Sequence, residues 1–147
     1  MAVQPSAVLF ACTMNSVRSP IAEAIMRHLH GQRIYVHSVG VRAGEPDPFV
    51  DAVMDEIGID MSRHRAKTFD QLEDTSFDLI ISLSPEAHHR ALEMTRTMAC
   101  DVELWNTLDP SIIEGSREVR LDAYRQVRDG LLRRIRDRFP PVSAPTV

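Results

Sequence analysis

Four short segments rich in apolar residues divide the chain, at residues 7–11, 34–39, 79–83 and 102–104, and the second of them alternates between apolar and polar residues. Each run is too short for a helix. The runs at 7–11 and 79–83 are apolar without alternation, which is typical of strands that are buried on both faces of a parallel sheet. Between the runs, apolar residues recur every three or four positions, as they do in amphipathic helices. The pattern therefore predicts strands that alternate with helices.

Two of the predicted helices begin with a polar residue followed by proline. Ser19 and Pro20 form one such pair and Asp47 and Pro48 the other, with an N-cap residue before a proline at the first helical position. An apolar stripe predicts a long final helix. The stripe consists of Tyr124, Val127, Leu131, Ile135 and Phe139.

Strands alternating with helices predict right-handed crossovers and a parallel sheet. The predicted fold class is α/β: a single doubly wound domain whose four-stranded parallel sheet has helices on both faces, in the flavodoxin-like order 2-1-3-4. With 147 residues, of which 44% are hydrophobic, the chain is long enough for one core and too short for two. We expect the domain over residues 1–140 and a disordered tail over residues 141–147.

Composition narrows the classes of function. A formal net charge of -4 argues against a nucleic-acid partner, and no run approaches the length of a membrane span or follows a basic leader. The two cysteines form neither a disulfide framework nor a zinc pattern, and the histidines lack metal-ligand spacing. We therefore expect a cytoplasmic protein without metal or cofactor, without nucleic-acid or membrane partners, and monomeric or weakly dimeric.

The segment between the first strand and the first helix carries the candidate chemistry. Cys12 follows the buried strand, at the sheet edge where open α/β folds bind ligands. The next residues must curl so that backbone N–H groups converge with the positive end of the helix dipole. Such a cradle binds a dianion and favours the thiolate form of a cysteine at its lip. Arg18 adds a planar fork for two oxygens of a tetrahedral oxyanion. A buried core cysteine before an ordinary helix is the structural alternative.

The motif CTMNSVRSPIAEA, which begins at Cys12, resembles the phosphate loop of the low-molecular-weight protein tyrosine phosphatase family, which also includes one class of arsenate reductases. VHSVGV, SRHRAK, FDLIISLS and the pair Asp109-Pro110 extend the resemblance over nearly the whole chain. It implies Cys12 as nucleophile, Arg18 as phosphate clamp and Asp109 as general acid. It also implies four residues that brace the loop by hydrogen bonds, namely Asn15, Ser19, Ser38 and His64. The expected phosphate-binding residues are Thr13, Met14, Asn15, Ser16, Val17 and Arg18.

The chain departs from the family pattern inside this loop. Met14 stands where the family usually has glycine, and Val17 stands where it usually has a second cysteine. We expect the neighbouring Asn15 to be the left-handed residue of the loop, so that the loop can form with methionine. Phe49 is a candidate wall for the substrate ring, and the alternative is a core position on the second helix.

The resemblance implies hydrolysis of phosphotyrosine in proteins through a cysteinyl-phosphate intermediate. The partners would be a phosphotyrosine protein and inorganic phosphate or a similar oxyanion. One alternative is an arsenate reductase that uses the same cysteine with an external thiol, since Cys100 is the only other cysteine. Another alternative is a catalytically weak regulator that binds phosphate or phosphoproteins. Arg42, Arg63, Arg65 and Lys67 are candidates for a ring of positive charge that attracts phosphorylated substrates to the mouth of the site, and ordinary solvated side chains are the alternative.

Overall fold

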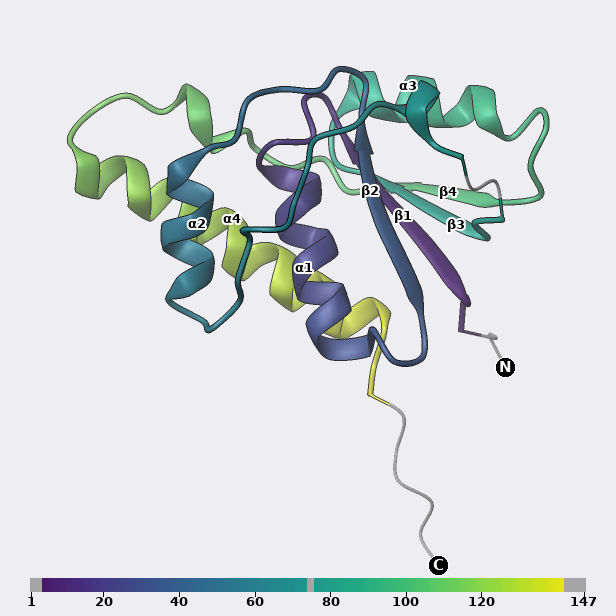
Figure 1. Cartoon of the computed structure of the whole chain (residues 1–147), viewed down its shortest axis with the longest axis horizontal. Coiled ribbons are helices and arrows are strands. Elements are labelled where there is room, and N and C mark those ends of the chain that lie inside the picture. The colour runs from purple at the N-terminus through teal and green to yellow at the C-terminus, as the bar shows by residue number, and fades with distance from the viewer. Residues whose placement is uncertain (1–3, 74–75, 142–147) are drawn as a thin grey trace, which may run out of the picture.

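The centre of the protein is a four-stranded parallel sheet in the order β2-β1-β3-β4. A computed structural model describes residues 4–73 and 76–141 (Figure 1). Its strands are β1 (Ala7–Cys12), β2 (Tyr35–Gly40), β3 (Leu79–Ser82) and β4 (Asp101–Leu104). The predicted fold class and strand order are confirmed. Residues 142–147, nearly all of the predicted tail, lie outside the described residues.

Helices cover both faces of the sheet, as Figure 1 shows. The helices α1 (Arg18–His30), α2 (Pro48–Asp55) and α4 (Arg117–Arg138) lie on one face, and α3 (Pro85–Met94) lies on the other. Two short turns, η1 (Phe69–Gln71) and η2 (Pro110–Ile112), lie in the connections. Over residues 4–73 and 76–141, no helix is long and apolar enough to cross a membrane.

The central strand β1 is buried on both faces. Val8, Phe10 and Cys12 point into the core beneath α1, α2 and α4, while Leu9 and Ala11 point into the smaller core beneath α3. The predicted stripe of α4 is buried over its whole length. Because the strand is packed from both sides, its last residue, Cys12, has little freedom to move.

The start of α1 differs from the sequence-based expectation. The helix begins at Arg18, Val17 occupies the N-cap position without a side-chain hydrogen bond, and Ser19 lies inside the first turn. The Ser19 hydroxyl lies 2.8 Å from Cys12 Sγ instead of capping the helix. Pro20 is tolerated because N–H groups in the first turn have no intrahelical partner. Ser19 thus belongs to the site around Cys12.

Candidate active site

The loop after β1 curls around the sulfur of Cys12. The backbone N–H of Asn15 donates to Cys12 Sγ at 3.2 Å. The Ser19 hydroxyl is the second hydrogen-bonding partner of this sulfur, at 2.8 Å. The first turn of α1 starts at Arg18 and has no side-chain cap, so its N–H groups and its dipole face the same loop. The thiol therefore lies beside a loop and a helix start whose backbone N–H groups suit a tetrahedral oxyanion.

The residues after β2 fix the direction of the loop's peptide groups. The carbonyl oxygens of Cys12, Thr13 and Met14 accept hydrogen bonds from N–H groups within residues 41–44, at 3.1, 2.8 and 2.8 Å. The segment thus continues the pairing of β2 with β1 beyond the end of the sheet. In each of these peptide units the N–H points the opposite way from the carbonyl, because the peptide is planar and trans. The N–H groups therefore point into the cradle.

Asn15 holds the loop in its curled form. Its φ of 52° is the only positive φ of a non-glycine residue over residues 4–73 and 76–141, which confirms Asn15 rather than Met14 as the left-handed residue. The fully buried side chain donates to the hydroxyls of Ser19 and Ser38, both at 2.9 Å. Its Oδ1 accepts from the Lys67 backbone N–H at 3.0 Å. Asn15 thereby ties the loop to α1, β2 and the segment before η1.

Further hydrogen bonds hold the residues that contact Asn15. Ser38 donates to the carboxylate of Glu23, which is 7% exposed and also pairs with Arg27 at 2.7 Å. His64 Nε2 lies 3.0 Å from the Asn15 carbonyl oxygen, and because a carbonyl can only accept, this nitrogen carries the proton. The four residues expected to brace the loop are all in hydrogen-bonding contact with it or with one another.

Glu23 was not anticipated from the sequence. Its spacing from Arg27 is that of an ordinary surface pair on a helix. The available signal was its position four residues after Ser19, which places both side chains on the same face of α1.

The three predicted catalytic residues line one cleft of about 250 Å³. Cys12 and Arg18 come from the loop and α1, and Asp109 comes from the loop after β4. Asp109 Oδ1 accepts from the backbone N–H and the hydroxyl of Ser111, at 2.9 and 2.7 Å. Arg18 donates to the carbonyl oxygen of Thr107 at 3.0 Å, which links it to the loop that carries Asp109. These contacts orient the carboxylate and the guanidinium toward the space above the thiol.

The cleft wall is acidic and aliphatic. Glu45 and Asp47 line it together with Asp109, and Met14 and Pro46 add apolar surface. Asp47 also caps α2 and accepts from the Tyr124 hydroxyl at 2.5 Å. Burial and the hydrogen bond to Asp47 strongly raise the pKa of Tyr124, so this tyrosine stays a proton donor.

Phe49 does not form the expected aromatic wall. Its ring lies 5.2 Å from the Tyr124 ring, centroid to centroid, and the Arg120 guanidinium sits 4.5 Å from its centroid. These contacts form because the ring points from α2 toward α4. Among the described residues, no aromatic side chain lines the cleft.

The predicted ring of basic residues does not surround the cleft. Arg42 forms two hydrogen bonds with Glu86, at 3.0 and 2.9 Å, and these bonds lower the pKa of the Glu86 carboxyl. Arg63, Arg65 and Lys67 line a separate cavity, and Arg65 also lines a pocket that adjoins the cleft and shares Ser16 and Asp47 with it. Within the described part of the chain, no three His, Cys, Asp or Glu side chains gather to hold a metal ion.

Cys100 lies far from the catalytic cysteine. It precedes β4, whose first residue, Asp101, pairs through Leu79 of β3 with Val8 of β1. Cys12 lies four residues beyond Val8 in the strand register, so Asp101 and Cys12 are offset by about 13 Å along the strands alone, and Cys100 lies one residue further back. A disulfide requires Cα atoms within about 7 Å. Burial raises the pKa of the Cys100 thiol, which makes it a poor nucleophile.

The fold and the site together define a protein family. A family model described as low molecular weight phosphotyrosine protein phosphatase matches residues 7–140. The chain therefore belongs to this family, whose members include both phosphatases and arsenate reductases.

Relatives within the family differ in their reactions. An arsenate reductase of Halalkalibacterium halodurans is 33% identical over 130 residues, covering 88% of this chain and 91% of the relative. The solved structure of the low molecular weight protein tyrosine phosphatase from T. tengcongensis has a TM-score of 0.73 and 26% identity, covering 90% of this chain and 95% of that chain. The YwlE arginine phosphatase has a TM-score of 0.70 and 26% identity, with 88% and 91% coverage.

Proposed function

We propose that this chain removes a phosphoryl group from a protein side chain, phosphotyrosine first, through a cysteinyl-phosphate intermediate on Cys12. The observation that carries the proposal is that Cys12, Arg18 and Asp109 line a single cleft. Binding of a phosphate group needs neither a nucleophile nor an acid. The arrangement therefore favours catalysis over a purely binding role.

In the first step, the Cys12 thiolate attacks phosphorus in line with the ester oxygen. The P–S bond forms as the P–O bond breaks, and Arg18 and the N–H cradle stabilise the charge on the equatorial oxygens. Asp109 gives its proton to the departing oxygen. The product is an alcohol or phenol and a phosphorylated Cys12.

In the second step, water attacks the cysteinyl phosphate. Asp109 accepts a proton from the water, the P–S bond breaks, and inorganic phosphate leaves. The Ser19 hydroxyl, 2.8 Å from Cys12 Sγ, donates to the sulfur as negative charge returns to it. Both steps use the same three side chains.

Arsenate reduction is the second candidate, and the names of the curated relatives favour it. The Cys12 thiolate would attack arsenic, forming an S–As bond while one hydroxyl group of arsenate takes a proton from Asp109 and leaves as water. An external thiol would then attack Cys12 sulfur, releasing arsenite and leaving a mixed disulfide that a second thiol reduces. The thiols must come from outside because Cys100 lies beyond reach of Cys12.

One set of assays separates the two reactions. Phosphate release is measured from p-nitrophenyl phosphate, a phosphotyrosine peptide and phosphoarginine, the last because a structural neighbour is an arginine phosphatase. We expect Cys12→Ser to abolish release and Asp109→Asn to reduce it by about 10²-fold to 10⁴-fold. Equal rates in the wild type and both variants would sink the phosphatase proposal. Arsenite formation with glutathione or thioredoxin, without turnover of any phosphate compound, would replace it by arsenate reduction.

A further inference from the structure

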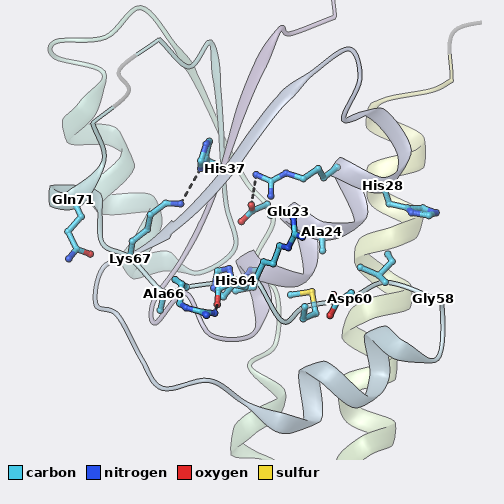
Figure 2. Close-up of a pocket in the computed structure, with 16 residues that line it drawn as sticks. Glu23, Ala24, His28, His37, Gly58, Asp60, His64, Ala66, Lys67 and Gln71 are labelled. Atoms are coloured by element: carbon cyan, nitrogen blue, oxygen red, sulfur yellow. Dashed lines mark hydrogen bonds and ion pairs between the residues drawn. The ribbon is translucent and has the colours of Figure 1, made fainter.

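A second and larger cavity is lined in part by His64 and Lys67, which hydrogen-bond to Asn15 of the phosphate loop. Its volume is about 680 Å³, and it is bounded by α1, the edge strand β2 and the segment that connects α2 to η1. Figure 2 shows Glu23, His37, His64 and Lys67 around this space, contributed by all three of these parts of the chain. The cavity is of the size that small-molecule ligands occupy in proteins.

Two cations on this lining, Arg65 and Lys67, form no ion pair with a carboxylate of the described residues. A third, Arg63, lies close enough to Asp60 to help lower the pKa of that carboxyl. Arg65 donates only to the backbone carbonyl oxygens of Ser62 and His64, at 3.0 and 2.9 Å. Lys67 Nζ lies 3.1 Å from His37 Nδ1, a neutral partner for a lysine donor. The cavity therefore presents uncompensated positive charge.

The two acids of the lining are already engaged. Glu23 accepts from Ser38 and pairs with Arg27. Asp60 accepts from the backbone N–H and the hydroxyl of Ser62, both at 2.9 Å, and these bonds lower the pKa of its carboxyl. Neither carboxylate forms an ion pair with Arg65 or Lys67, so the complementary ligand of these two cations is an anion.

The remaining lining is apolar. Pro20 and Ala24 of α1 and Ile59 and Met61 of the connecting segment also line the cavity. A free phosphate ion would leave this surface unused, whereas an organic phosphate with a flat ring would cover it. We propose that the cavity binds a small organic phosphate of mononucleotide size, and that the bound molecule changes turnover at Cys12.

The link to the catalytic loop runs through Asn15. His64 donates to the Asn15 carbonyl oxygen, and the Lys67 backbone N–H donates to Asn15 Oδ1, both at 3.0 Å. Glu23 reaches the same residue through Ser38. A ligand that favours one position of this lining favours one position of the phosphate loop, because both are held by the same hydrogen bonds.

Calorimetry with adenosine 5′-monophosphate tests the binding. The titration uses Arg18→Ala, which weakens oxyanion binding in the catalytic cleft, and it is repeated on wild-type protein whose Cys12 is alkylated. We expect binding in both, weakened at least tenfold by Arg65→Ala with Lys67→Ala. The matched control, Arg133→Ala with Arg136→Ala on the exposed side of α4, removes the same charge elsewhere and should leave the affinity unchanged.

Several outcomes would overturn the binding proposal. One is that the nucleotide gives no heat of binding with either the Arg18→Ala protein or the alkylated wild type. Another is that the Arg65→Ala, Lys67→Ala variant binds it with the same affinity as the α4 control. The proposal would also be contradicted if adenosine alone or inorganic phosphate alone bound as tightly as the nucleotide. The cations bind only the phosphate part and the apolar lining only the ring, so the nucleotide should bind more tightly than either part.

The coupling to turnover rests on the proposed function and has its own readout. Competition in the catalytic cleft raises KM for p-nitrophenyl phosphate and leaves kcat unchanged, whereas an effect from the cavity changes kcat. We expect the kcat change to be lost in the Arg65→Ala, Lys67→Ala protein and kept in the α4 control. An unchanged kcat at saturating nucleotide would refute the coupling. If wild-type protein hydrolyses no phosphate ester, the proposed function fails, and calorimetry still decides the binding.

Discussion

Replacing Asn15 by alanine removes the residue that holds the phosphate loop in its curl. The buried side chain makes three hydrogen bonds, to Ser19, Ser38 and the Lys67 backbone N–H, and its φ is 52°. Alanine makes none of these bonds and disfavours the left-handed backbone region. The substitution therefore affects both the bonding and the conformation of the loop.

The expected loss of stability can be worked out from these contacts. Three hydrogen bonds at about 1 kcal/mol each contribute about 3 kcal/mol. The left-handed conformation of alanine adds about 1–2 kcal/mol. The total of about 4–5 kcal/mol is a large part of the roughly 5–15 kcal/mol by which a domain of this size is stable.

Urea unfolding of the Asn15 variants measures this loss. Asn15→Gly is the control, because glycine loses the same bonds but adopts positive φ freely, so it should be less destabilised than alanine by about 1 kcal/mol. Both variants should bind inorganic phosphate more weakly, since the N–H groups no longer converge. An Asn15→Ala protein within about 1 kcal/mol of wild type would refute this account of the loop.

Three further predictions concern other parts of the molecule. In Gly44→Ala, the new Cβ would lie 2.6 Å from Ser16 Oγ, so we expect a loss of about 1–3 kcal/mol, seen as a lower melting temperature than wild type; an unchanged melting temperature would contradict the packing. Hydrogen bonds from two arginines of α4 lower the pKa of Glu56 from 4.5 to about 2, below its unfolded value. The stability that Glu56 supplies is therefore present above pH 4.5 and is lost as the pH falls toward 2. The melting temperature of Glu56→Gln should lie below that of wild type at neutral pH, and the two should converge over this range. Equal melting temperatures at neutral pH would show that the ion pairs of Glu56 do not contribute. Mild peroxide should oxidise Cys12 beyond the sulfenic acid or, in the presence of an added thiol, convert it to a mixed disulfide with that thiol. Detection of a Cys12–Cys100 disulfide by mass spectrometry would contradict this, because it would require the strands to separate.

The sheet could be predicted because its signals are local. The apolar run at β1 and the capping pair at Asp47-Pro48 depend only on neighbouring residues, and the structure has both where the pattern indicates. The start of α1 could not be predicted in the same way, because the Ser19 hydroxyl had two possible partners. Its contact with Cys12 arises only once the loop has folded back on the strand.

The missed parts of the site depend on tertiary packing. Phe49 fits the apolar side of α2 whether its ring faces the cleft or α4, and only the position of Tyr124 decides between them. Glu23 resembles a surface residue until Ser38 of β2 covers it. The sequence likewise contains no signal for the path of the segment that carries Arg63 and Arg65, and that path places both arginines outside the lining of the cleft.

The proposed mechanism requires that Cys12 itself becomes phosphorylated. Rapid acid quenching during turnover of p-nitrophenyl phosphate, followed by mass spectrometry of the peptides, detects the intermediate directly. We predict a phosphate group on Cys12 in the wild type and none in Cys12→Ser. Phosphate release by the wild type without any phosphorylated Cys12, or with the label on another residue, would contradict the account.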